Sequence, residues 1–224
     1  MEDIVEETKL LAKDGVKEIV IIAQDVTRYG LDLYNKLALP ELLDKLCEIE
    51  GLKWIRLLYC YPERVTDELI DCIKRQDKIV KYLDIPMQHC SDEILKRMNR
   101  KTTGAELRAL VAKLRREIPG ITLRTTFITG FPGETEEQFN ELGEFAEEMG
   151  ACAIIRGVRN TTDFEYERTM EATNHRIYPD ITTVMLFTPA PVADISSSTV
   201  REVLSFGRSV EEFMPVGVDI NKYL

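Results

Sequence analysis

The sequence predicts an α/β fold, because short apolar runs alternate with amphipathic helical segments along most of the chain. Two of the helical segments open with a capping box, formed by Thr103 with Glu106 and by Thr135 with Gln138. Strand-like runs that alternate with helices are typical of a parallel sheet with crossover helices. Either a partial barrel or a doubly wound sheet satisfies this pattern.

The first elements follow one repeat, a helix and then a buried strand. The opening helix ends near Gly15 and leads to a strand over 18–23. Pro40 begins the next helix, and Thr66 begins the one after the second strand. Ser91 is predicted to cap the helix after the third strand. The remaining strands are predicted at 54–59, 81–86, 121–129, 151–158 and 182–187, and the remaining helices at 105–118, 136–149, 161–177 and 195–204.

Composition limits the possible partners. The chain has 224 residues, 44% of them hydrophobic, which is enough for a packed core. Its formal charge of -10 argues against a broad nucleic-acid surface and against attraction to an anionic membrane. No apolar run is long enough to span a bilayer, and the N-terminal stretch is acidic where a signal peptide is basic. We therefore expect a cytoplasmic protein.

The five cysteines are scattered and never spaced as CxxC or CxxxCxxC. We interpret them as reduced, isolated thiols and predict no metal ligands. The alternative is a zinc or iron–sulfur site assembled from distant positions, which no spacing in the sequence supports. The five are Cys47, Cys60, Cys72, Cys90 and Cys152.

Polar side chains follow each of the first four predicted strands. In parallel α/β sheets the loops that leave the carboxyl ends of the strands form the ligand site. The recurrence of polar residues in these loops predicts a site on one rim, although a cap, a turn or a surface ion pair explains any one of them. The rim residues are Gln24, Asp25, Arg28, Glu63, Arg64, Gln88, His89, Asp92 and Glu134.

Four segments together resemble the radical SAM methylthiotransferases, in the branch that modifies an aspartate of a small-subunit ribosomal protein. They are IIAQDVTRYG, LLYCYPERVTDELI, YLDIPMQHCSDEILKRMNRKTT and LRTTFITGFPGETEEQF, and the resemblance covers residues 1–149. It implies a partial radical SAM barrel, a ribosomal-protein partner, S-adenosylmethionine and a 4Fe–4S cluster. It also implies that Gln88, Gly130, Gly133 and Glu134 lie near S-adenosylmethionine.

The chain departs from that family in one motif that its chemistry requires. The family holds its cluster on a CxxxCxxC loop, and this sequence has no such trio of cysteines. By this resemblance, the chain is expected to begin one helix after the position of that loop. We therefore expect no methylthiotransfer from this chain alone, and at most a residual affinity for S-adenosylmethionine.

Beyond Gly150 two features suit an anion. Arg156 and Arg159 end a predicted strand, where guanidinium groups can bind a phosphate; ion pairs with Glu167 or Asp163 are the alternative. Three serines, 196–198, begin a helix whose free N–H groups favour an anion, with plain capping as the alternative.

The segments IIRGVRNTTDFEYERTM and ISSSTVRE resemble the C-terminal half of bacterial phosphopantetheine adenylyltransferase, over residues 151–224. The resemblance implies that Arg156 binds the phosphate of phosphopantetheine, and that ATP with magnesium is the second substrate. That family's first nucleotide-binding strand and its histidine motif have no counterpart in residues 1–149. The implied ATP-binding residues are Gly157, Val158, Arg159, Glu167, Val192, Ala193, Asp194, Ile195, Ser196, Ser197 and Ser198.

Together these patterns predict two domains: a barrel segment at 1–150 and a Rossmann-like adenylyltransferase segment at 151–224, through which one continuous sheet could run. We favour a hybrid of two truncated enzymes with the full activity of neither. The alternatives are a methylthiotransferase fragment completed by a partner chain and a residual adenylyltransferase or ATP-binding protein. Apolar residues at Ile21, Ile22 and 184–187 are expected to be exposed and to favour self-association.

Overall fold

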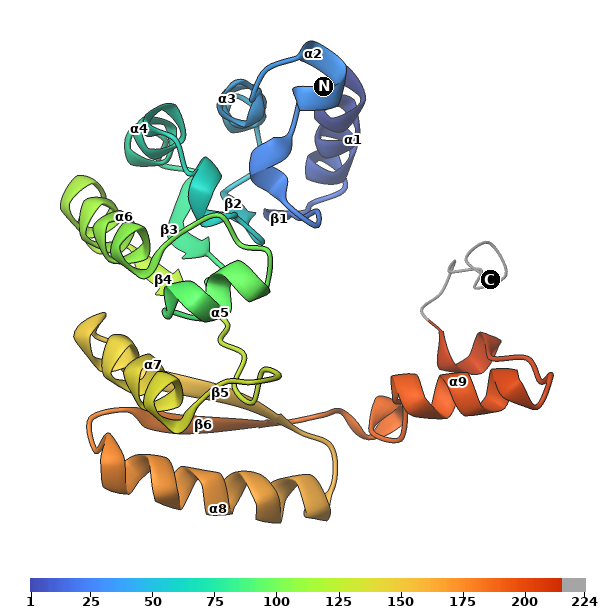
Figure 1. Cartoon of the computed structure of the whole chain (residues 1–224). Helices are drawn as coiled ribbons and strands as arrows, with labels where there is room; N and C mark the ends of the chain where they lie inside the picture. The colour runs from blue at the N-terminus through green and yellow to red at the C-terminus, as the bar shows by residue number, and fades with distance from the viewer. Residues whose placement is uncertain (215–224) are drawn as a thin grey trace. The chain divides into compact units, whose positions relative to one another are not determined.

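A computed structural model of the chain describes residues 1–214, apart from the side chain of Ser197. The chain divides into two compact units, Met1–Met149 and Gly150–Leu224. Both units have an α/β organisation with a parallel sheet, so the predicted fold class is confirmed (Figure 1). No helix within residues 1–214 is long and apolar enough to cross a membrane.

The first unit is built on four parallel strands that pair in the order in which they occur in the chain. They are β1 (Glu18–Ile21), β2 (Trp54–Leu57), β3 (Ile79–Asp84) and β4 (Thr122–Arg124). Sequential parallel order is the strand order of a βα barrel, whereas a doubly wound sheet reverses direction partway. The sheet therefore has the strand order of a barrel segment.

Helices separate these strands, and four of them contact one another in turn, α1 with α3, α3 with α4, and α4 with α6 (Figure 1). The predicted cap of α4 by Thr66 and both predicted capping boxes, on α6 and α7, are present. Ser91 is at the predicted N-cap of α5, but its side chain makes no capping hydrogen bond. The helices of this unit are α1 (Glu2–Lys13), α2 (Leu31–Tyr34), α3 (Leu39–Cys47), α4 (Asp67–Arg75), α5 (Asp92–Arg97), α6 (Gly104–Glu117) and α7 (Glu136–Glu148).

The main hydrophobic core of the described chain lies wholly in the first unit. Ile55, Leu57 and Leu83 of the central strands are fully buried, and so is Phe145 on α7. The second unit contributes only Val158, Ile181 and Val210 to the buried apolar residues described. Because burial of apolar surface drives folding, we expect most of the stability of the chain to reside in the first unit.

Two expectations about strands need correction. The strand predicted at 121–129 is regular only over β4, and an isolated bridge between Gln88 and Phe127 continues the pairing. The continuous sheet through the join is wrong, because β4 pairs with β3 whereas the next strand pairs with the one that follows it. The described chain thus forms one four-stranded and one two-stranded sheet.

The second unit has two parallel strands, β5 (Ala153–Val158) and β6 (Thr182–Phe187), joined by α8 (Thr161–Ile177) and followed by α9 (Ser197–Ser205). α8 covers one face of the pair, where Phe187 stacks on Phe164 at 6.2 Å between ring centroids. Alternate residues point to opposite faces of a strand. The face opposite to α8 therefore carries Ile155, Val184 and Leu186, whose exposed fractions are 62%, 40% and 58%.

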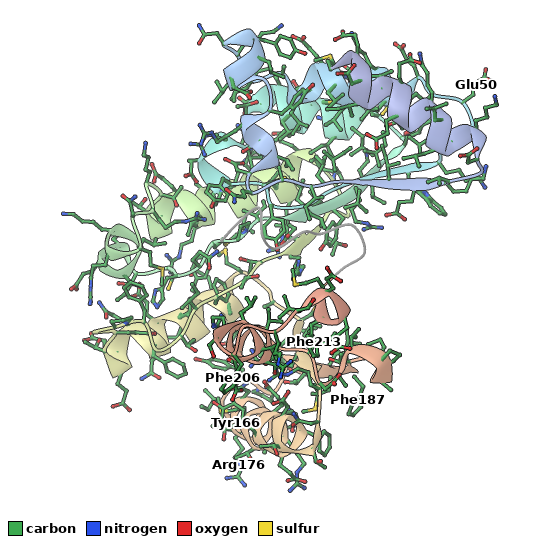
Figure 2. The ribbon with its side chains drawn as sticks, turned by 90° about the vertical axis from the view of Figure 1, so that its right-hand side faces the viewer. Glu50, Tyr166, Arg176, Phe187, Phe206 and Phe213 are labelled. Carbon is green, nitrogen blue, oxygen red and sulfur yellow. The ribbon has the colours of Figure 1, made fainter. Side chains whose placement is uncertain are left out.

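The predicted exposure of apolar residues is largely confirmed. Ile22 at the end of the edge strand β1 is 59% exposed, whereas Ile21 is partly buried. At the end of β6, Phe187 is 70% exposed despite its stacking partner. Figure 2 labels Phe187 together with Tyr166 on α8 and Phe206 at the end of α9, two further exposed aromatic side chains.

One ion pair between α3 and α4 makes stability depend on pH. Both oxygens of Asp44 accept hydrogen bonds from Arg75, at 2.7 and 2.6 Å, and these bonds lower the pKa of Asp44 from its ordinary value of 3.8. The stabilisation is therefore present above 3.8 and is lost as the pH falls through the lowered pKa. Asp44→Asn should cost at most about 1 kcal/mol at neutral pH, because Arg75 is half exposed.

Urea unfolding of the two proteins at neutral and at strongly acidic pH measures this difference, which should vanish in acid. Asp71→Asn on the exposed face of α4 is the matched control and should leave the unfolding midpoint unchanged. A difference between Asp44→Asn and the parent chain that persisted unchanged in acid would contradict the role assigned to the ion pair.

Candidate functional site

A pocket of about 530 Å³ opens at the carboxyl ends of β1, β2 and β3. This is the rim at which the sequence predicts a ligand site, and Gln24 and Gln88 of the predicted rim residues line the pocket. Aromatic rings and amide groups dominate the wall, which suits a ligand with a planar ring and several hydrogen-bonding groups. The lining residues are Ile22, Ala23, Gln24, Tyr59, Tyr61, Pro86 and Gln88.

Two of the lining residues adopt the left-handed backbone conformation, which is uncommon for residues other than glycine. Tyr59 has a φ of 58° and Gln88 a φ of 72°. Such conformations cost free energy and occur where surrounding contacts enforce them, often at functional sites. Gln88 is held by two backbone hydrogen bonds, from its N–H to Thr126 O at 2.9 Å and from Ile128 N–H to its carbonyl at 2.8 Å.

Asp84, at the end of β3, fixes the turn that carries Tyr59. Its carboxylate accepts the N–H of Tyr59 at 3.4 Å, and its carbonyl accepts the N–H of Cys60 at 2.8 Å. The residue is only 2% exposed, and Arg124 lies 3.3 Å from the same carboxylate. A buried carboxylate with a guanidinium partner and a backbone donor keeps the pocket wall preformed.

Asp25 joins the loop after β1 to the 3-10 turn after β2, Pro62–Arg64. Its side chain is 7% exposed and accepts hydrogen bonds from the N–H of Thr27 at 3.0 Å and from Arg64 at 2.9 Å. For Asp25 and Arg64 the structure therefore supports the alternative in which two rim residues form an ion pair with each other. Of the other rim residues, Arg28 is exposed, and Asp92 accepts the N–H of Gly104 at 2.7 Å.

His89 and Glu134 form a buried pair behind the rim. Their side chains are 0% and 4% exposed, and His89 Nε2 lies 3.3 Å from Glu134 Oε1. Nδ1 of His89 accepts the N–H of Ser91 at 3.0 Å, so it carries no proton and the ring donates from Nε2. The second carboxylate oxygen accepts the N–H of Phe131 at 2.9 Å. Both carboxylate oxygens of Glu134 are thus engaged in hydrogen bonds within the protein.

The turn before Glu134 requires its glycines. Gly130 and Gly133 have φ values of 73° and 78°. A Cβ on Gly133 would come within 2.5 Å of the guanidinium of Arg97, which donates hydrogen bonds to the carbonyls of Gly133 and Pro132. The glycines therefore permit a tight turn that Glu134 and Arg97 lock from two sides.

The cysteines do not fit an iron–sulfur cluster. Cys47, Cys60, Cys72 and Cys90 are buried and only Cys152 is exposed, and no three potential ligands gather within residues 1–214. Burial raises the pKa of Cys60, Cys72 and Cys90 to about 12, and cluster ligands must be thiolates. A cluster on this chain would need thiolates from elsewhere.

The two arginines predicted to bind phosphate have carboxylate partners. Arg156 makes a bidentate ion pair with Glu167, at 2.7 and 2.5 Å, and Arg159 contacts Asp163 at 2.9 Å. The alternative of structural ion pairs therefore matches the geometry. Of their neighbours in the predicted ATP site, Val158 is fully buried, and Gly157 is exposed.

The predicted serine site also shows plain capping. Ser196 Oγ accepts the N–H of Thr199 at 3.1 Å and caps α9, while Ser198 is exposed. The backbone of Ser197 begins α9, and its side chain lies outside the described part of the chain. Before it, Val192 ends the short 3-10 turn Ala190–Val192, and Ala193, Asp194 and Ile195 link that turn to the helix. Nucleotide binding at these residues stays a prediction.

Comparison with known proteins identifies the class of the chain. The family model of the Radical SAM superfamily matches residues 1–146, more than half of the sequence, and the chain belongs to this superfamily. The parallel strand order and the pocket at the carboxyl edge agree with that assignment.

The chain is also similar to a group of curated methylthiotransferases. Three of them are the ribosomal protein uS12 methylthiotransferases RimO of Alkaliphilus oremlandii, Lachnoclostridium phytofermentans and Caldanaerobacter subterraneus. Their matched segments are 59%, 60% and 61% identical to this chain. The matches extend over 148, 149 and 148 residues and cover 66% of this chain, but 34% of each relative. The chain thus spans about a third of the length of the curated relatives it matches. None of these three relatives is an adenylyltransferase. The resemblance of residues 151–224 to phosphopantetheine adenylyltransferase therefore stays a prediction, and residues 215–224 lie outside the described part of the chain.

Sequence reasoning missed Tyr59, Tyr61 and Asp84. The run Leu58–Tyr61 contains two tyrosines directly after a strand, a signal that could have drawn attention to the pocket wall. The role of Asp84 depends on a contact with a different loop, which no local pattern reveals.

Proposed function

We propose that the first unit is an S-adenosylmethionine-binding part of a methylthiotransferase, and that the cluster thiolates for turnover come from outside these 224 residues. The pocket at the carboxyl edge of β1–β3 carries this proposal. Its volume lies within the range of small-molecule sites, roughly 300–1,000 Å³. The RimO relatives are methylthiotransferases of ribosomal protein uS12, and we propose the same substrate for the completed enzyme.

The residues of the pocket fit the chemistry of S-adenosylmethionine. Tyr59 and Tyr61 offer aromatic faces to an adenine ring, and the amides of Gln24 and Gln88 offer both donors and acceptors. Glu134, both of whose oxygens are engaged, shapes the neighbouring turn, so we assign it a positioning role. S-adenosylmethionine supplies the activated sulfonium, and this chain supplies its binding surface.

Calorimetry of the full chain with S-adenosylmethionine tests the binding step. Ala23→Trp fills the pocket from an exposed position and should weaken binding at least tenfold, whereas Ala172→Trp, on the exposed face of α8, should leave it unchanged. Absence of binding, or equal binding to Ala23→Trp, would refute the assignment of this pocket.

Anaerobic incubation with iron and sulfide tests the second half of the proposal. We expect no bound cluster on the chain alone, because its buried thiols are scattered and protonated. Stoichiometric iron and sulfide that remained bound after desalting would show that no thiolates from outside these 224 residues are required.

A further inference from the structure

Arg100 contacts two walls of the pocket at the carboxyl edge of β1–β3 without lining the pocket itself. The Cζ atom of its guanidinium group lies 4.4 Å from the centroid of the Tyr61 ring, and Nη2 donates a hydrogen bond to the carbonyl of Pro86. Tyr61 comes after β2 and Pro86 after β3, and both residues line the pocket. A single side chain thus connects two loops that form the wall.

The end of α5 holds the backbone of Arg100 in place. Asn99 has a left-handed φ of 58°, a conformation that asparagine tolerates better than most residues. The N–H of Arg100 donates to the carbonyl of Leu95 at 2.8 Å, and the N–H of Asn99 donates to that of Lys96 at 3.0 Å. These two bonds form the Schellman pattern of a helix end. The backbone of Arg100 is therefore fixed by α5, independently of the two pocket loops.

The charge of Arg100 is placed in an environment that packing alone does not require. The residue is half-buried, and the arginine ion pairs described within residues 1–214 do not include it. Its Nε atom is buried and has no hydrogen-bond partner, which costs free energy. An unbranched apolar side chain would fill the same space without a buried donor. The ring of Tyr61 is the aromatic group that stabilises this cation.

We propose that Arg100 is a positioning residue that orients the ring of Tyr61 toward the adenine of S-adenosylmethionine. The inference rests on the proposed function of the pocket. A planar guanidinium group can stack on a ring and donate to a carbonyl at the same time, which fixes Tyr61 relative to Pro86. A cation over one face of the ring also makes the other face less attractive to the sulfonium charge than to a neutral aromatic ring. Arg100 acts through Tyr61 and does not contact the ligand.

Calorimetry of the full chain with S-adenosylmethionine measures the effect. Arg100→Met removes the stack and the hydrogen bond, and it should weaken binding at least tenfold. Arg115→Met is the matched control, because Arg115 also donates to one backbone carbonyl, that of Met149 at 2.6 Å; its affinity should equal that of the parent chain. Parent affinity in Arg100→Met would overturn the inference alone. Absence of binding by the parent chain would refute the proposed function, and the inference with it.

A double-mutant cycle separates action through Tyr61 from a general effect on the fold. In Tyr61→Leu the ring is absent, so adding Arg100→Met should weaken binding further by less than threefold. If the two losses multiplied in the double variant, Arg100 and Tyr61 would act independently, and the inference would be overturned.

S-adenosylhomocysteine identifies the part of the ligand that Tyr61 recognises. It has the same adenosine group as S-adenosylmethionine but no sulfonium charge. Arg100→Met should weaken the binding of both ligands by the same factor, because the ring contacts the part that they share. A loss confined to S-adenosylmethionine would assign Tyr61 to the sulfonium group and contradict the proposed orientation.

Arg100→Lys tests the planar group with the charge retained, and it also covers the case that Arg100→Met does not fold. The ammonium group can still donate to the carbonyl of Pro86, but it cannot stack on Tyr61 while it does so. We expect binding of S-adenosylmethionine to be at least threefold weaker than in the parent chain. Parent affinity in Arg100→Lys would show that the planar group is not required, which would overturn the inference.

Discussion

Replacing Glu134 by alanine is expected to lower the free energy of unfolding by about 2–6 kcal/mol. The carboxylate is 4% exposed and accepts hydrogen bonds from His89 Nε2 and from the N–H of Phe131. Alanine leaves both donors buried without an acceptor, and each unsatisfied donor costs about 1–3 kcal/mol. It also removes one of the two constraints on the turn through Gly130 and Gly133, so affinity for S-adenosylmethionine should fall as well.

Urea unfolding followed by the fluorescence of Trp54 measures this loss, because Trp54 is the only tryptophan of the chain and lies on β2 of the first unit. Glu137→Ala is the control. Glu137 is an exposed glutamate close to Glu134 in the sequence, and it lies in the first turn of α7. The substitution should cost no more than about 1 kcal/mol through the helix dipole. If the two variants unfolded at the same urea concentration, the buried network would have no energetic role.

The glutamine variant distinguishes hydrogen bonding from charge. In Glu134→Gln the amide oxygen can accept one of the two hydrogen bonds, while the amide N–H₂ group faces the other donor. We expect the free energy of unfolding of Glu134→Gln to lie between that of the parent chain and that of Glu134→Ala. A glutamine variant as stable as the parent would show that only one of the two bonds stabilises the turn.

Local signals explain which elements could be predicted from the sequence. The capping boxes at Thr103 and Thr135 and the cap at Thr66 involve residues three apart, and all three are present. The helix over 161–177 was likewise predicted at its observed bounds. These interactions depend on the chain within one helical turn, so neighbouring sequence is sufficient to specify them.

Non-local contacts explain most of what could not be predicted. The left-handed backbone of Tyr59 depends on Asp84, twenty-five positions away along the chain. The length of β4 depends on how far β3 remains beside it, which an apolar run does not reveal. For Arg156, the sequence left phosphate binding and ion pairing equally open. In the described chain its guanidinium group is paired with Glu167, a contact that no local pattern in the sequence specifies.

The second unit shows why its exposed surface was predictable. Parallel sheets are normally covered on both faces, and the described pair β5–β6 has α8 on one face only. Apolar residues at alternate positions, such as Ile155 and Leu186, then remain in solvent. This face is the surface through which the predicted self-association would occur, and that association stays a prediction.

Phe145→Ala is expected to cost about 3–5 kcal/mol, the usual effect of removing a fully buried phenylalanine. The ring of Phe145 packs edge to face against Phe127 at 6.1 Å between centroids, and the guanidinium of Arg108 lies 4.8 Å above it. Through these contacts α7 belongs to the core of the first unit. Truncation leaves a cavity that neighbouring side chains fill only in part, so the penalty exceeds the loss of apolar burial alone.

The matched control is Phe187→Ala, which makes the same chemical change in the second unit. Phe187 is 70% exposed and its main aromatic contact is the stack on Phe164, so the loss should not exceed about 1.5 kcal/mol. Trp54 reports on the first unit, and its unfolding transition should move strongly for Phe145→Ala and hardly at all for Phe187→Ala. Equal shifts of that transition would contradict the inference that most of the stability resides in the core that ends at α7.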